Sequence, residues 1–238
     1  LGSSVCMDKE MSKRIWREAG LPVVPWRTLI SGRDDPESPA LAEAVFKDLG
    51  TPLFVKPANA GSSVGVSKVK NAAELTEAIR TAWRHDKKAL VEKAISGREI
   101  ECSVMGYEAP WAFPPGEVIP AGNHGFYDYD AKYVDPDGAL LSVPADLEED
   151  TAKGIRSIAV QAYRTVEAGG LARVDFLLDT VSGEIFINEI NTLPGMTRIS
   201  LFPRMTAAEG LGFTDMLERL IQGALEQASY RDGLSYDH

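Results

Sequence analysis

Residues 171–191 read LARVDFLLDTVSGEIFINEIN, and this segment decides the fold class. Its two apolar runs, Leu171–Leu178 and Glu184–Ile190, are rich in residues that favour strands. They flank the short segment Asp179–Gly183, whose turn-forming residues predict a β-hairpin. Such strands alternate along the chain with helical patterns. This mixture favours an α+β protein with antiparallel sheets over a doubly wound nucleotide-binding fold.

The polar residues of this hairpin are spaced as a metal site requires. Side chains two residues apart on a strand share a face, so Arg173 lies beside Asp175 and Glu189 beside Asn191. If the two strands pair, two carboxylates and an amide oxygen converge beside one guanidinium. Oxygen donors of this kind suit Mg²⁺ or Mn²⁺ and not zinc. The alternative is a solvent-facing sheet that carries surface salt bridges.

The segment Lys56–Gly65, KPANAGSSVG, is typical of a phosphate-binding loop. Its glycines let backbone N–H groups approach an anion closely, and the hydroxyls of Ser62 and Ser63 add donors beside Lys56. Because the lysine precedes the glycines, the segment is neither a Walker A loop nor a G-x-G-x-x-G motif. A plain turn between two strands is the alternative.

The remaining pattern predicts a two-part chain. Helices are expected at residues 9–19 with Asp8 as cap, at 38–49, 71–82 and 155–166, and from a cap at Thr214 to about residue 229. Further strands are expected at residues 53–55, 89–92 and 99–104. Residues 107–138 are rich in Pro, Gly, Asp and Tyr and predict a long loop of the kind that acts as a lid. We expect residues 1–94 to form a domain with the glycine-rich loop, and residues 95–238 a domain with the lid and metal site.

Composition excludes several classes of protein. The chain has 238 residues and a net charge of −10, with +3 in residues 1–94 and −13 in residues 95–238. This acidic balance argues against a nucleic-acid partner. No apolar stretch is long enough to insert into a membrane, and the start shows no secretory signal. The two cysteines, Cys6 and Cys102, are too few for a disulfide framework and indicate reduced thiols in the cytoplasm.

Two further groups of residues are candidates for nucleotide binding. The segment Phe126–Tyr133, FYDYDAKY, combines aromatics with Lys132 and could close over a phosphate, although aromatics in loops often only anchor the loop. Glu92, Glu99 and Glu101 lie near the expected domain boundary. One of these carboxylates could bind ribose hydroxyls, or all three could lie on a solvated strand face.

Six segments together resemble the D-alanine–D-alanine ligases of the ATP-grasp superfamily. They are CMDKEMSKR from Cys6, LFVKPANAGSSVGVSKV from Leu53, LVEKAISGREIE from Leu90, FYDYDAKYVD from Phe126, ARVDF from Ala172 and NEINTLPGMTRIS from Asn188. They occur in the family's order and span residues 6 to about 202. The resemblance implies two α+β lobes with antiparallel sheets that grip ATP between them.

The resemblance also implies roles for individual residues. The residues that would bind ATP are Lys9, Lys56, Ser62, Ser63, Glu92, Lys93, Ile95, Glu99, Phe126 and Lys132. Two Mg²⁺ or Mn²⁺ ions would be held by Asp175, Glu189 and Asn191. Arg173 and the N–H of Gly195 would stabilise the tetrahedral anion of the reaction. The second D-alanine would be surrounded by Ser62 with Tyr133 and by Ser200 with Leu201.

The implied reaction has two steps. The carboxylate of one D-alanine attacks the γ-phosphate of ATP, giving ADP and an acyl phosphate, and the amine of a second D-alanine then displaces phosphate. In the family the product D-alanyl-D-alanine supplies peptidoglycan synthesis for the cell wall. The partners implied are these small molecules, with a homodimer as a further option.

Two alternatives remain open from the sequence. The family has an N-terminal domain that supplies a glutamate for the first D-alanine, and this sequence begins after it. The chain would then be a nucleotide-binding fragment, which binds ATP but makes dipeptide slowly. In the family, a histidine in place of Tyr133 accompanies use of D-lactate, so the other alternative is a D-alanine–D-lactate type ligase.

Overall fold

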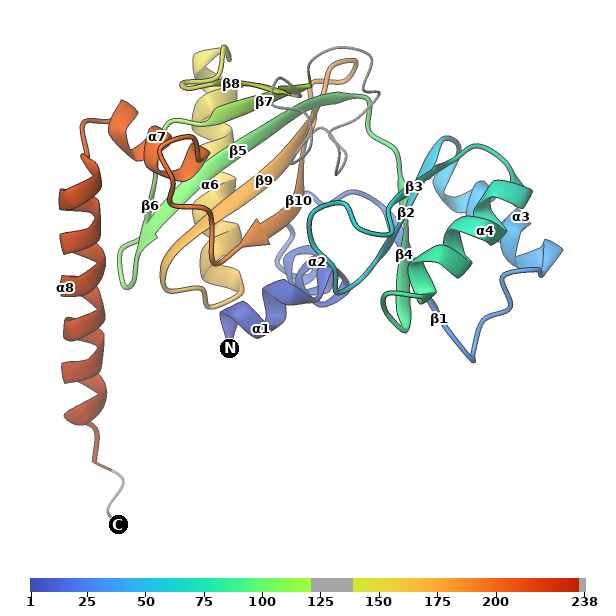
Figure 1. The fold of residues 1–238 in the computed structure, drawn as a ribbon, viewed down its shortest axis with the longest axis horizontal. Coiled ribbons are helices and arrows are strands. Elements are labelled where there is room, and N and C mark those ends of the chain that lie inside the picture. Colours follow the sequence, from blue (N-terminus) through green and yellow to red (C-terminus); the bar gives the residue numbers. More distant parts are fainter. Residues whose placement is uncertain (121–138, 236–238) are drawn as a thin grey trace.

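The computed structural model describes residues 1–120 and 139–235, which form two antiparallel sheets with helices packed on them (Figure 1). The smaller sheet contains β1 (Trp26–Ile30), β2 (Leu53–Pro57), β3 (Ser67–Val69) and β4 (Lys88–Lys93). Its strand order is β1-β4-β2-β3, and every pairing is antiparallel. This arrangement confirms the predicted α+β class.

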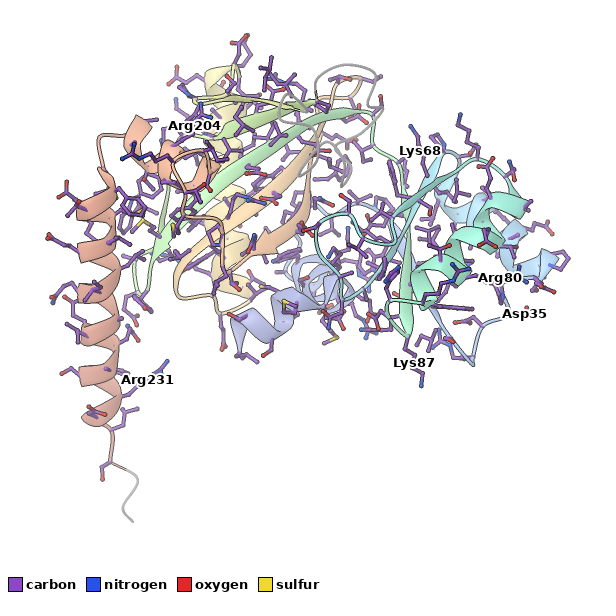
Figure 2. All side chains as sticks on the ribbon, in the orientation of Figure 1. Asp35, Lys68, Arg80, Lys87, Arg204 and Arg231 are labelled. Atoms are coloured by element: carbon purple, nitrogen blue, oxygen red, sulfur yellow. The ribbon has the colours of Figure 1, made fainter. Side chains whose placement is uncertain are left out.

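Two helices complete the smaller lobe, α3 (Pro39–Leu49) and α4 (Ala72–Trp83). Their apolar faces pack against the sheet, with Val45, Leu75 and Ile79 buried against Leu53 and Val91. Charged side chains such as those of Lys68, Arg80 and Lys87 lie around the outside of the lobe (Figure 2).

The larger sheet contains β5 (Gly97–Gly106), β6 (Trp111–Ala112), β7 (Gly116–Pro120), β8 (Ala139–Ser142), β9 (Gly170–Asp179) and β10 (Ile185–Asn191). Its order is β10-β9-β5-β7-β8, and β6 pairs with β5. The central contact is the long pairing of β5 with β9, in which Gly97 lies opposite Asp179 and Gly106 opposite Gly170. The predicted hairpin is confirmed, because β9 and β10 pair antiparallel.

The two faces of this sheet are covered differently. Helix α6 (Glu149–Thr165) packs on the face that carries Ile100, Cys102 and Val174. Helices α7 (Leu201–Ala208) and α8 (Phe213–Asp232) cover one end of the opposite face, over Met105. Glu101 of β5, Asp175 of β9 and Glu189 of β10 lie on this opposite face, beyond the part that α7 and α8 cover, because side chains alternate along a strand.

The chain begins with α1 (Gly2–Met7) and α2 (Lys9–Glu18), which pack on the larger lobe although the smaller sheet follows them in sequence. Trp16 is fully buried, and its indole N–H donates to the carbonyl of Ala162 in α6 at 3.1 Å. The isolated bridge between Val23 and Ile187 brings the next residues to β10. The division of the chain near residue 94 stays a prediction. The first helices nevertheless bury side chains in the core of the lobe that follows.

Local signals predicted three helix starts correctly, whereas α1 and α7 were not predicted and α6 begins before the predicted residue 155. Asp8 accepts hydrogen bonds from the backbone of Glu10 and Met11, Ser38 from that of Leu41, and Asn71 from that of Glu74. The predicted cap at Thr214 is wrong, because α8 begins at Phe213 with Gly212 as its N-cap. A glycine also serves at this position, since its backbone adopts the required extended conformation freely.

The predicted loop over residues 107–138 is partly wrong. It contains β6 and β7, which pair with β5. Strand β6 has two residues and β7 ends in Pro120, so neither gives the alternation that marks a longer strand. Residues 121–138 lie outside the described part. Within the described ranges, no helix combines the length and apolar character needed to cross a membrane.

Candidate functional site

Three carboxylates lie side by side across neighbouring strands of the larger sheet. Glu189 of β10 is opposite Asp175 of β9, and Asp175 is opposite Glu101 of β5. Arg173 donates to both oxygens of Asp175, from Nε at 2.7 Å and from Nη2 at 2.7 Å. Its Nε also lies 2.9 Å from an oxygen of Glu101. The predicted grouping of Arg173 with Asp175 is confirmed, and Glu101 joins it.

A one-residue bulge brings Glu189 onto this face. The register of β10 shifts between Ile187 and Glu189, so that Asn188 is the extra residue. Without that shift, Glu189 would lie opposite Val174 and point into the core under α6, because a one-residue slip exchanges the faces of a strand. Asn191 lies opposite Arg173 in the shifted register. The bulge is therefore what makes the expected metal-ligand set converge.

The neighbouring carboxylates keep the guanidinium of Arg173 protonated. Burial alone would lower the pKa of Arg173, but the attraction of Asp175, and then of Glu101, outweighs it and raises that pKa above its usual value. The guanidinium therefore stays protonated at all relevant pH values. It compensates like charges that would otherwise repel one another on adjacent strands.

Lys9 connects this row to the other lobe. Its ammonium lies 3.3 Å from an oxygen of Glu189 and donates a short hydrogen bond to the carbonyl of Ala60, within the glycine-rich segment Lys56–Gly65. The backbone N–H of Lys9 donates to the carbonyl of Ala58. One residue at the start of α2 therefore contacts both the predicted phosphate loop and the predicted metal site.

Lys56 lies beside a buried cluster of charges. Its ammonium is 2.8 Å from Glu92 and donates to Asn188 Oδ1 at 3.2 Å. Glu92 is only 3% exposed and also pairs with Lys13 at 3.1 Å. Burial would raise the pKa of Glu92, but the attraction of Lys13 and then of Lys56 outweighs it, so that pKa lies below its usual value.

Sequence reasoning missed Lys13 and Asn188. Lys13 is fully buried between Ser12 and Trp16 on the inner face of α2, and a charged residue at a core position of a helix is the signal that could have found it. For Asn188, the signal is the spacing of Ile187 and Ile190. Both face the core, three positions apart, where a regular strand would place core residues two apart.

The glycine-rich loop has an unusual backbone. Ser62 and Ser63 both adopt left-handed conformations, with φ of 53° and 58°, which are rare for residues other than glycine. Consecutive residues in such conformations can turn several N–H groups toward one anion. Gly65 has φ of 71°, and a Cβ there would lie 2.9 Å from Pro57 Cγ and 2.7 Å from His85 Cδ2, so a side chain at this position would clash. The geometry supports a phosphate-binding role, which stays a prediction.

The residues predicted to read the base and ribose lie where the chain crosses between the sheets. Lys93 is exposed at the end of β4, and Ile95 is half-buried in the segment between β4 and β5. Glu99 is half-buried on β5, two residues before Glu101. Their roles stay predictions, and those of Phe126, Lys132 and Tyr133 fall on residues outside the described ranges.

The segment after β10 carries the residues predicted to bind the second D-alanine. Gly195 is exposed, and a Cβ there would lie 2.7 Å from Ser200 Oγ, so a larger residue would displace that hydroxyl. Ser200 Oγ accepts a hydrogen bond from the backbone of Thr197 at 3.1 Å. Leu201, the first residue of α7, is 5% exposed and packs in the core, so its side chain is not available to a ligand.

The chemistry of the donor set fits a divalent cation. Asp175, Glu189 and Asn191 offer only oxygen to a metal, as Mg²⁺ and Mn²⁺ prefer. Asp175 is bound to Arg173 and Glu189 lies near Lys9. Accordingly, in residues 1–120 and 139–235 no three His, Cys, Asp or Glu side chains are already grouped to hold an ion. The lysine and arginine contacts occupy oxygens that a cation would take over.

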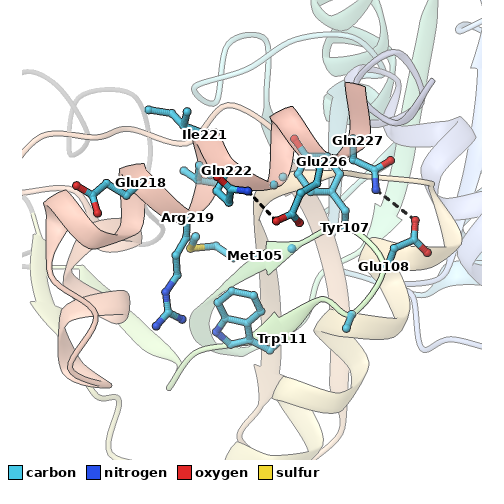
Figure 3. A pocket seen from close by; sticks show the side chains of 15 residues that line it. Met105, Tyr107, Glu108, Trp111, Glu218, Arg219, Ile221, Gln222, Glu226 and Gln227 are labelled. Atoms are coloured by element: carbon cyan, nitrogen blue, oxygen red, sulfur yellow. Dashed lines mark hydrogen bonds between the residues drawn. The ribbon is translucent and has the colours of Figure 1, made fainter. Parts of the chain in front are cut away.

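A separate pocket of about 790 Å³ lies between α8 and the end of β5 (Figure 3). Arg219 lies over the ring of Trp111 there, with 5.9 Å between the guanidinium carbon and the ring centroid. The hydrogen bond from Gln227 to Glu108 crosses its rim. None of the predicted site residues lines this pocket, so it is distinct from the charged row.

Residues 15–222, most of the chain, match the family described as D-ala D-ala ligase C-terminus. The chain belongs to this family.

Relatives in this family agree in sequence and in fold. The chain is 48% identical to D-alanine–D-alanine ligase A of Chromobacterium violaceum, over 99% of the chain and 63% of that protein. It is 49% identical to D-alanine–D-alanine ligase A of Salmonella typhimurium, over 98% of the chain and 63% of that protein. The D-alanine-D-alanine ligase structure from Coxiella burnetii has a TM-score of 0.83 at 37% identity, covering 97% of this chain and 60% of that one.

A second solved structure has a different name. VanG D-Ala:D-Ser ligase from Enterococcus faecalis matches with a TM-score of 0.81 at 36% identity, covering 93% of this chain and 62% of that one. These neighbours support the predicted ATP-grasp arrangement of two lobes. The chain spans about three-fifths of the length of the curated relatives that it matches.

Proposed function

We propose that this chain forms the nucleotide- and metal-binding part of an ADP-forming D-alanine–D-alanine ligase. The observation that carries the proposal is the position of Lys9, which contacts Ala60 in the glycine-rich segment and Glu189 in the carboxylate row. In phosphoryl-transfer enzymes, the phosphates of a bound nucleoside triphosphate lie beside both a loop of N–H donors and a divalent cation. The contacts of Lys9 join these two features across the lobes.

Each charged group has a task in this proposal. Lys9 and Lys56 bind phosphate oxygens, and the left-handed backbone at Ser62 and Ser63 offers N–H donors to the same groups. Asp175, Glu189 and Asn191 would hold two Mg²⁺ or Mn²⁺ ions, which supply positive charge that neutralises the phosphates when bound. A homodimer and a cytoplasmic location stay predictions.

Arg173 serves the second step. The amine of one D-alanine attacks the acyl carbon of the other, forming a C–N bond and placing negative charge on the carbonyl oxygen. Collapse of this intermediate breaks the bond to phosphate. Glu101 is not among the expected metal ligands and lies 2.9 Å from the guanidinium, so it can keep Arg173 oriented toward that charge when a cation takes up Asp175, as in other anion-binding catalytic sites.

The first prediction concerns nucleotide binding by the 238-residue chain. We expect calorimetry to detect ATP binding in the presence of Mg²⁺, and we expect Lys56→Met to weaken it by at least about tenfold. Lys68→Met removes an exposed charge from the neighbouring strand β3 and serves as the matched control, with little expected change. Equal affinities of the two variants would contradict the assignment of Lys56.

The same samples separate the ligase from a fragment that binds without catalysis. Phosphate release that depends on D-alanine supports ligation by the chain itself. ATP binding without that release supports the fragment. An absence of ATP binding would contradict both.

The second prediction concerns the acceptor. We propose that the protein prefers D-alanine to D-lactate at neutral pH because the neutral phenol of Tyr133 tolerates the ammonium of D-alanine. The imidazole of Tyr133→His, when protonated, would repel that ammonium and attract the lactate carboxylate. We therefore expect lactate use by the variant to rise as pH falls, measured as the product ratio in a competition between the two acceptors. A ratio that the substitution leaves unaltered at every pH would show that Tyr133 is remote from the acceptor.

A further inference from the structure

Lys13 is the most deeply buried cation of the chain's described part for which the proposed function has no task. Its side chain is 0% exposed, although lysine is rarely found fully buried without a partner. It lies 3.1 Å from Glu92 Oε1 and 3.4 Å from the carbonyl of Val24, and its ammonium is 5.7 Å from the centroid of the Trp26 ring. A cation held at this cost calls for a reason beyond general stability.

The reason lies in the balance of charge around Glu92. Glu92 pairs through one oxygen with Lys13 and through the other with Lys56 at 2.8 Å. The trio of two lysines and one carboxylate therefore carries a net charge of +1. Without Lys13, the remaining pair of Lys56 and Glu92 would be neutral, and its attraction for an anion would be much weaker.

The geometry gives the two lysines different positions. Lys56 also donates to Asn188, the residue next to Glu189, so its ammonium lies at the border of the carboxylate row. Lys13 lies on the inner side of α2, and its named partners are Glu92, the Val24 carbonyl and the Trp26 ring. Only Lys56 is therefore placed to meet a ligand, and Lys13 can act only through Glu92.

We propose that Lys13 is a positioning residue for phosphate binding: it neutralises Glu92, so that the positive charge of Lys56 stays available to the phosphates of a nucleotide. This inference rests on the proposed function, because it takes Lys56 as a phosphate ligand. Burial, the largest influence, lowers the pKa of Lys13 to about 8, against the attraction of Glu92. Lys13 is therefore still mostly protonated at pH 7.

The test is a charge-balance series read out as the dissociation constant of ATP, with Mg²⁺ present and each variant's Tm recorded. Lys13→Met leaves the cluster neutral, and we expect the dissociation constant to rise by about tenfold or more. Adding Glu92→Gln in that background restores the net charge of +1, and we expect most of the loss to be recovered. Arg14→Met removes an exposed cation from the next position of the same helix and should change the constant less than about twofold.

A purely structural role for Lys13 predicts another pattern. In that case Lys13→Met would lower Tm but leave the dissociation constant of the folded protein equal to that of Arg14→Met, and this result would overturn the inference. A double variant that binds ATP no better than Lys13→Met would overturn it too. If Lys13→Met does not fold, Lys13→Gln removes the same charge while keeping N–H donors for Glu92 and Val24, and the same outcomes apply.

Failure of the proposed function would look different. If Lys56→Met binds ATP as tightly as the unaltered chain, Lys56 is not a phosphate ligand, and the proposed function and this inference both fail. If Lys56→Met binds weakly while Lys13→Met binds normally, only the inference about Lys13 fails.

Discussion

Under the proposed ligase function, Glu189→Gln is expected to lower D-alanine-dependent phosphate release by about a hundredfold or more, with the protein still folded. Glutamine keeps the size of the side chain but removes the negative charge with which Glu189 would bind a divalent cation. The side chain is 35% exposed, and the amide oxygen of a glutamine can still accept a hydrogen bond from Lys9, so the substitution costs the fold little. The measurement is phosphate release at saturating Mg²⁺, together with thermal unfolding.

Two comparisons make this result specific to the metal. ATP binding by the unaltered chain should be tighter with Mg²⁺ than with a chelator, and Glu189→Gln should lose most of that difference. Glu184→Gln makes the same chemical change immediately before β10, at an exposed residue that bonds to Ser182, and should retain both properties. Near-normal phosphate release by Glu189→Gln would contradict the metal assignment.

The sequence predicted the elements whose signals are local. The capping residues Asp8, Ser38 and Asn71 each mark a helix start through hydrogen bonds to residues two or three positions on, so no knowledge of the rest of the fold is needed. The hairpin of β9 and β10 was equally accessible, because its turn and both of its strands lie within some twenty consecutive residues. Short strands without such signals, such as β6, were missed because only pairing with β5 defines them.

The convergence of the carboxylates in the candidate site could be predicted only in part from the sequence. The expected grouping of Glu189 with Asp175 is correct, but strict alternation in an unbroken hairpin does not produce it. It depends on the extra residue Asn188, which exchanges the faces of β10 half-way along. The residue types indicated a metal site. The register of β10 on β9, however, is set by the burial of Ile187 and Ile190 in a core shared with α6.

Contacts between distant segments were the part of the site that the sequence predicted least well. Lys13, Glu92 and Lys56 come from α2, β4 and β2, and nothing in the spacing of these residues indicates that one carboxylate serves two lysines. From the sequence, Glu101 was expected either to bind ribose or to lie on a solvated strand face. The pairing of β5 with β9 places it beside Asp175 instead. Long-range pairing of strands thus decides which charges meet, and the motifs decide which charges are present.

Arg173→Lys is expected to reduce turnover by about a hundredfold or more while ATP affinity changes less than about threefold. The guanidinium contacts both oxygens of Asp175 at 2.7 Å and an oxygen of Glu101 at 2.9 Å, and its planar fork keeps a fixed orientation toward the site. A lysine ammonium retains the charge but is a single point on a flexible stem, so it cannot hold this orientation. Turnover and ATP binding are measured separately on the same preparations.

A second arginine of the same sheet provides the matched control. Arg98 of β5 forms a similar two-point contact with Glu117, at 2.7 and 2.6 Å, on the face of the sheet that α6 covers. Arg98→Lys therefore loses comparable geometry at a comparable contact, but away from the carboxylate row, and should leave turnover within about threefold. Equal losses from Arg98→Lys and Arg173→Lys would mean that sheet stability, and not anion stabilisation, explains the effect.

Removing the charge altogether tests the electrostatic basis of the row. In Arg173→Met, Asp175 and Glu101 remain opposite each other on adjacent strands without their shared cation, so their pKa values in the folded state should lie above those in the unfolded chain. Carboxyl groups shifted in this direction favour folding at low pH and oppose it once pH rises through the folded pKa values. The loss in unfolding free energy relative to the unaltered protein should therefore be largest near pH 7 and shrink toward about pH 4. A loss that is independent of pH would show that Arg173 stabilises the sheet by packing, and that the carboxylates do not need its charge.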